Sequence, residues 1–125
     1  MDYLAYDPAH DRVWVPAGNT GSVVVVDAGT DRVTTIEGFR TAAIERHGTK
    51  RTVGPSSATA GDGVVYVGNR ADASVCAVDA ASVRMGPCLQ LDSMPDGLAY
   101  VASRKEVWVT TPRDRSIVVL DAATA

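Results

Sequence analysis

The chain has 125 residues, a net charge of −3, 46% hydrophobic residues and 22% charged residues. This size and composition fit one ordinary globular domain and exclude collagen-like, acidic-tail and disordered chains. The small negative charge argues against non-specific binding of nucleic acid or anionic membranes over the whole surface, but it is compatible with a local basic patch. No apolar run approaches the roughly 20 residues that a membrane helix needs, so we expect no membrane insertion.

In chain order, the first expected element is a short strand at residues 4–6, followed by a polar turn. A hairpin then runs from Trp14 to Asp27, with a short polar loop between two apolar stretches. A further strand, rich in Thr and Val, is expected over residues 32–37. We call these four stretches strands A to D, and we interpret them as one antiparallel sheet.

Residues 38–53 form an insertion between this unit and the next. The insertion holds four basic residues and one acidic residue, Glu45, which gives it a local charge of +3. Its basic residues are Arg40, Arg46, Lys50 and Arg51. Within it, residues 40–47 are the stretch most compatible with a turn or two of helix, because elsewhere glycine, proline and β-branched residues recur too often.

The four-strand unit recurs along the chain. In each copy an aromatic residue stands thirteen residues before an aspartate, and a serine stands eight residues after the aromatic. The aromatics are Trp14, Tyr66 and Trp108, the serines are Ser22, Ser74 and Ser116, and the aspartates are Asp27, Asp79 and Asp121. The last two aromatics stand 42 residues apart and the first two 52, a difference that the insertion explains. A period of about 42 residues with four short strands is typical of a β-propeller blade.

Three stretches also resemble the YVTN repeat of the YncE-like β-propeller family. Tyr66-Val67-Gly68-Asn69 resembles its Tyr-Val-Thr-Asn motif, and Trp108-Val109-Thr110-Thr111 is a looser copy. Pro95-Asp96-Gly97 is similar to the opening that the family has before strand A. The resemblance covers nearly the whole chain apart from the insertion. It implies an all-β fold made of four-stranded antiparallel blades.

On this interpretation residues 1–125 are one partial propeller. The expected parts are blade one at about 1–37, the insertion at about 38–53, blade two at about 54–91 and blade three at about 92–125. The third blade lacks its last strand. Because propellers close with four to eight blades, these units leave an incomplete ring with exposed end faces. Either the missing remainder of a longer propeller or a second copy of the chain would be needed to cover them.

The recurring aromatics and aspartates are expected to have structural roles. Each aromatic would fill the gap between neighbouring blades, and each aspartate would accept backbone hydrogen bonds in the turn after strand C. His10 and His47 have no partner at metal-ligand or triad spacing. We therefore expect no catalytic residue, no metal and no cofactor in this chain.

Cys76 and Cys88 are the only cysteines, and they fall in strands C and D of the second blade. The Gly86-Pro87 pair should break the ladder of strand D just before Cys88 and could bring the two thiols together. Two interpretations stay open, a disulfide in an oxidising compartment or two small buried side chains. The resemblance favours a periplasmic or extracellular protein, although Met1-Asp2-Tyr3 does not open a secretory signal.

The loops from strand B to C and from D to A converge at the mouth of a propeller's channel, where rigid scaffolds present functional groups. The candidate ligand-binding residues there are Asn19, Arg46, His47, Lys50, Arg51, Asn69, Arg70, Arg113 and Arg115. Such basic donors suit an anionic ligand, namely a carboxylate, a phosphate or single-stranded nucleic acid. The structural alternative is a solvated surface.

Three functions are compatible with these features. The first, which the resemblance implies, is a non-enzymatic binding or scaffold module that holds a ligand or a protein partner on this loop face. The alternative is a segment of a propeller enzyme, such as a lyase or a quinoprotein-dehydrogenase-like protein. A weaker alternative is binding of single-stranded DNA, which is known within the family that the chain resembles.

Overall fold

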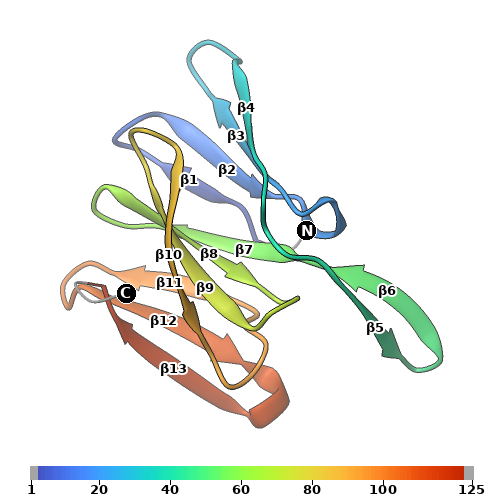
Figure 1. Ribbon diagram of the computed structural model, residues 1–125. Helices are drawn as coiled ribbons and strands as arrows, with labels where there is room; N and C mark the ends of the chain where they lie inside the picture. The colour runs from blue at the N-terminus through green and yellow to red at the C-terminus, as the bar shows by residue number, and fades with distance from the viewer. Residues whose placement is uncertain (1–2, 123–125) are drawn as a thin grey trace.

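The computed structural model describes residues 3–122, and in that range the chain is built of antiparallel sheets with no α-helix (Figure 1). The first sheet comprises β1 (Ala5–Asp7), β2 (Arg12–Pro16), β3 (Val23–Asp27) and β4 (Val33–Ile36). The second comprises β7 (Pro55–Ala60), β8 (Val64–Asn69), β9 (Ser74–Asp79) and β10 (Arg84–Gln90). The third comprises β11 (Leu98–Val101), β12 (Glu106–Thr111) and β13 (Ser116–Asp121). Short 3₁₀ turns, η1 (Gly18–Thr20) and η2 (Pro112–Asp114), come after β2 and β12.

In each of these sheets, strands that are neighbours in sequence are also neighbours in space. Trp14 lies opposite Ala5 and Val25, and Trp108 lies opposite Ala99 and Val119, so the aromatics occupy the same place in their sheets. The prediction of an all-β fold in an unclosed ring is confirmed. The first two sheets have four strands each, and within the described residues the third has three.

The core lies in the two joints between successive sheets. In the first joint, Trp14 and Val25 pack in one cluster with Val65 and Val67 of the second sheet. In the second joint, Tyr66 joins a cluster with residues of the third sheet that include Val107, Val109 and Leu120. Trp14 is completely buried and Tyr66 is 3% exposed, as expected of side chains that fill the gap between blades.

Polar contacts also cross both joints. A guanidinium nitrogen of Arg12, at the start of β2, donates to the carbonyl oxygen of Ala80 in the turn after β9 at 2.7 Å. Between the second and third sheets, the N–H of Tyr100 donates to the Thr59 hydroxyl at 3.0 Å, and its phenol donates to Asp62 at 2.9 Å. The ring of Tyr100 also stacks on Tyr66, with centroids 6.2 Å apart. In both joints, neighbouring blades are therefore held together by apolar packing and by hydrogen bonds.

The insertion is a hairpin, and the helix predicted for residues 40–47 is wrong. β5 (Ala42–Arg46) pairs with β6 (Thr49–Val53), and the hairpin extends away from the blades (Figure 1). The two-residue loop His47-Gly48 has φ angles of 52° and 78°, which match the type I′ turn that suits the twist of a hairpin. Pairing with the β-branched residues of β6 overrides the helical propensity of Ala42 and Ala43.

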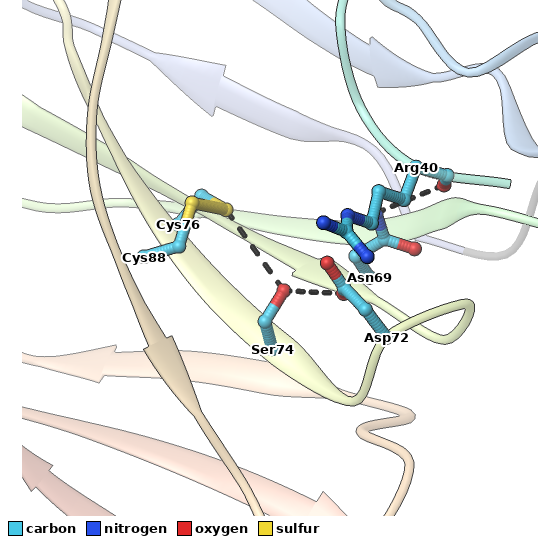
Figure 2. Close-up of a disulfide and its surroundings, with 6 residues drawn as sticks. All are labelled: Arg40, Asn69, Asp72, Ser74, Cys76 and Cys88. Atoms are coloured by element: carbon cyan, nitrogen blue, oxygen red, sulfur yellow. Dashed lines mark hydrogen bonds between the residues drawn. A yellow bond between two sulfur atoms is a disulfide. The ribbon is translucent and has the colours of Figure 1, made fainter.

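The cysteines face each other across β9 and β10. Cys76 and Cys88 are direct partners in the register, and their sulfurs are joined in a disulfide with an S–S distance of 2.08 Å (Figure 2). Gly86-Pro87 interrupts the regular ladder just before Cys88, as expected. It forms a bulge, because the register shifts between Met85 and Cys88 while β10 continues to Gln90.

Two of the recurring aspartates act in the turns as expected. The carboxylate of Asp27 accepts the N–H groups of Gly29 and Thr30, at 3.0 and 3.1 Å. The carboxylate of Asp79 accepts both the N–H and the hydroxyl of Ser82. These bonds supply the turn after strand C with acceptors that the sheet ladder does not provide.

The hydroxyl and the N–H of Ser82 hold the pKa of Asp79 below its ordinary value of 3.8. Ser82→Ala should therefore raise this pKa, as a titration of the Asp79 carboxyl carbon by NMR would measure. Because the folded-state pKa is depressed, this group stabilises the fold above pH 3.8, and its contribution disappears as the pH falls through the folded-state value. The exposed Ser103 offers a control, since Ser103→Ala should leave the titration unchanged. An Asp79 titration that is identical in Ser82→Ala and the parent contradicts the assignment.

Candidate functional site

Three segments meet in a cleft at the loop end of the first two blades. They are the η1 turn, the end of β6 with the start of β7, and the loop after β8. The cleft has a volume of about 570 Å³. Its polar side chains are Asn19, Arg51, Thr52, Ser56 and Arg70. Three residues predicted from the sequence, Asn19, Arg51 and Arg70, therefore line one cleft.

Gly54 brings the walls of this cleft together. A Cβ atom at this position would collide with the carbonyl oxygen of Gly18, so η1 can approach the chain this closely only beside a glycine. The carbonyl oxygen of Gly54 accepts the N–H of Arg70 at 3.2 Å. The backbone of the loop that carries Arg70 is thus fixed against the segment that comes after Arg51.

Ser56 supplies the unusual polar group of the cleft. The residue is only 6% exposed, and its hydroxyl has no hydrogen-bond partner among the described residues. An unsatisfied buried hydroxyl costs about 1–3 kcal/mol. Because the hydroxyl oxygen is itself buried, a ligand oxygen in the cleft would become its partner only after the Ser56 side chain turned toward the cleft, beside the guanidinium groups of the exposed Arg51 and the half-buried Arg70.

Arg70 also lines two smaller clefts on the same face. One, of about 150 Å³, contains Asp96 and Arg113, and the other, of about 60 Å³, contains Glu45 and Arg113. Each of these smaller clefts therefore combines two arginines with a carboxylate. The cleft beside Ser56 has no acidic lining residue, so it is the better place for an anion.

The other predicted residues lie elsewhere. Asn69 is 1% exposed, and its amide nitrogen donates to the carbonyl oxygen of Arg40 at 3.1 Å (Figure 2). Its amide oxygen accepts the N–H of Ala71 at 2.9 Å. His47 lies at the hairpin tip, and Lys50 lies on β6 opposite Glu45. Arg115 is exposed after η2. The side chain of Arg46 lies outside the part of the chain that the structure describes.

Sequence reasoning missed Ser56. The available signal was the pair Ser56-Ser57, two adjacent serines inside a strand whose six residues include four that are buried. Buried hydroxyls normally find hydrogen-bond partners, so such a pair calls for an explanation.

Residues 3–122 hold neither a metal cluster nor a membrane-spanning helix. No three His, Cys, Asp or Glu side chains in this range gather closely enough to hold a metal ion. No helix in the range has the length and apolar character needed to cross a bilayer.

No protein-family description and no curated protein matches the sequence. Solved structures do resemble it. Hydrazine synthase of Kuenenia stuttgartiensis superposes over 98% of this chain with a TM-score of 0.78 and 20% identity. The structure of U3-55K and the WD40 repeats of RRP9 each superpose over 93%, with TM-scores of 0.61 and identities of 13% and 12%.

The described residues form three blades of a β-propeller. These likenesses concern the fold, because the identities are low. The chain spans about a third of the matched structures, namely 32% of the hydrazine synthase chain and 35% of each of the other two.

Proposed function

We propose that the chain is a non-enzymatic binding or scaffold module of a β-propeller, of the YncE-like type that its repeats resemble. Its ligand would be an anionic group held in the cleft between η1, β6 and β7. The observation that carries the proposal is the unpartnered, buried Ser56 hydroxyl, in a cleft that two arginines line and no acidic residue does.

The chemistry of the cleft fits a phosphate or carboxylate oxygen. A guanidinium group offers paired N–H donors that match both anions, and the Ser56 hydroxyl and the Asn19 amide offer further donors. Asn19 belongs to the first blade, Arg51 to the insertion hairpin and Arg70 to the second blade, so an anion held by all three would also hold these segments together. Binding would therefore stabilise the first joint of the propeller.

Calorimetric titration with inorganic phosphate, and separately with acetate, tests the proposal and distinguishes the two anions. Arg70→Gln should weaken binding of the preferred anion by about tenfold or more, because hydrogen bonds to charged groups contribute about 1.5–3 kcal/mol. Arg32→Gln is the matched control, since Arg32 is exposed in the turn before β4 and lies outside the cleft. Absence of saturable binding of either anion to the parent chain would remove the proposal.

Ser56→Ala should separate binding from folding. The variant loses a buried hydroxyl without a partner, so its urea midpoint should equal or exceed that of the parent. Its affinity for the bound anion should fall, because the ligand loses a donor. A lower midpoint combined with unchanged affinity would contradict the role given to Ser56.

The other hypotheses remain predictions. A single-stranded DNA oligonucleotide in the same titration tests the nucleic-acid alternative, whose binding through basic side chains should weaken steeply with salt. The enzyme alternative requires turnover in a longer protein that contains this segment, lost on substitution of Arg46, His47 or Arg70. A protein partner, either a second copy or further blades of a longer propeller, would cover the exposed faces of the end blades.

A further inference from the structure

Both joints between the blades are made by the same side chains of the repeat. The aromatic of one blade packs on the valine pair of the next, Trp14 with Val65 and Val67 in the first joint. Tyr66 packs in the same way with Val107 and Val109 in the second joint. Since alternate residues of a strand point to opposite faces, every blade carries an aromatic on one face and a valine pair on the other.

The third blade has this aromatic side uncovered. We define the aromatic face as Trp108, Thr110, Ile117 and Val119, which share one side of β12 and β13. Trp108 is 40% exposed, whereas Trp14, at the equivalent place in the first blade, is fully buried. Ile117 and Val119 are 58% and 47% exposed, while their counterparts Val23 and Val25 are 0% and 2% exposed.

The first blade has the opposite side uncovered. We define the valine face as Val13, Val15, Val24, Val26 and Val33, which share one side of β2, β3 and β4. The first four are half-buried, and Val33 is 60% exposed. The equivalent pairs in the other two blades, Val65 with Val67 and Val107 with Val109, are all 0% exposed. The chain thus exposes an aromatic face on its third blade and a valine face on its first blade, and these are the two kinds of face that pack together in each joint inside the chain.

We propose that the aromatic face of one chain packs on the valine face of a second copy, head to tail. Two such contacts, each a repeat of the joints already inside the chain, would join two copies into one closed ring of six blades. The occupant is a second copy because the two uncovered faces match each other and neither matches itself. Trp108 of one copy would lie over Val13 and Val15 of the other, as Trp14 lies over Val65 and Val67.

The exposed area agrees with such a contact. The chain exposes 7016 Å², against the roughly 6,400 Å² expected of a folded monomer of this mass. The excess of about 600 Å² is spread over both end faces, so two copies would together bury about 1,200 Å² in their two contacts, which is the lower end of the range for a specific interface. The aromatic at the centre of the contact is the kind of residue that dominates binding energy at interfaces.

The test combines solution mass with complementing variants. The parent chain should sediment with twice its mass of 13.1 kDa. Trp108→Glu and Val15→Glu should each be monomeric, because each places a buried carboxylate in both contacts. In an equimolar mixture, the intact valine face of the first variant fits the intact aromatic face of the second, while the other contact of the pair holds both carboxylates. The mixture should therefore form dimers more readily than either variant alone but less readily than the parent.

Leu89→Glu serves as the matched control, since Leu89 is 41% exposed on the outer strand of the middle blade and should leave the dimer intact. Ile117→Glu and Val33→Glu replace the first pair if circular dichroism shows that either does not fold. A parent chain that is monomeric at about 100 μM overturns the proposal. A dimer that persists in Val15→Glu also overturns it, because that dimer would be formed by two aromatic faces and not by an aromatic face on a valine face. Species larger than a dimer overturn the closed ring.

Discussion

Trp14→Ala should lower the free energy of unfolding by about 3–5 kcal/mol, the range for removing a fully buried tryptophan. The side chain is 0% exposed and fills the joint between the first and second blades. Total stabilities of domains this size are about 5–15 kcal/mol, so this one change removes a large part. Urea denaturation monitored by circular dichroism measures the difference.

Trp108→Ala is the matched control because it changes the same residue at the same position of the repeat. Trp108 is 40% exposed, so at protein concentrations that keep the chain monomeric its replacement should cost about 1 kcal/mol. Trp14→Phe should be milder than Trp14→Ala, since it keeps most of the volume and removes an indole N–H that has no partner among the described residues. Equal losses for Trp14→Ala and Trp108→Ala would show that the joint is not the core of the molecule.

Reduction of the disulfide should lower the stability of the chain by about 3 kcal/mol. The bond closes a loop between residues 12 positions apart, and opening it restores conformational freedom to the unfolded chain. Urea midpoints with and without dithiothreitol measure the effect, with the free thiols counted in each sample. Cys88 is exposed, so reductant can reach the bond.

The double variant Cys76→Ala/Cys88→Ala is the control for the reductant. It should match the reduced parent in stability and should not respond to dithiothreitol. An unchanged midpoint in a parent with two titratable thiols would mean that the bond contributes nothing to folding.

Most of the blade structure was predictable because the repeat fixes position and burial together. The spacing of Trp14, Tyr66 and Trp108 placed three equivalent strands, and their packing resulted from the requirement that neighbouring blades fill a shared gap. Burial of Trp108 could not be read from the same pattern, since it depends on a neighbour packed against the third blade. The repeat pattern thus predicts on which side of the sheet a side chain lies, whereas the exposed fraction of that side chain depends on whether another blade packs against it.

The hairpin of the insertion was missed because the helix propensity of residues 40–47 was considered without the turn signal that ends this stretch. Ala42 and Ala43 favour a helix, but His47-Gly48 can adopt the positive φ angles of a two-residue hairpin loop, and Thr49 begins a strand on its far side. The dipeptide between two extended stretches was the signal. A helix there would have left β6 without a partner.

The candidate cleft was predictable only in part. Asn19 and Arg70 stood out as polar residues of loops and Arg51 as a basic residue of the insertion, and the propeller architecture, whose connections converge at one end, placed them on one face. Ser56 could not be found in this way, because it belongs to a strand and matters only through its missing hydrogen-bond partner. Asn69 shows the reverse, since a loop-end residue that looked available is buried and bonded to backbone groups.

The middle sheet, β7 to β10, has a consequence for the order of unfolding. Each blade packs mainly on its neighbours in sequence, so the chain behaves as a short linear array whose stability is a sum of blades and joints. In a single chain each end blade depends on one joint, whereas the middle blade takes part in both and carries the disulfide. Amide protons of β4 and β13 therefore exchange through local fraying, while those of β8 and β9 exchange only when the whole molecule opens. The lifetime of the folded state is set in the middle blade.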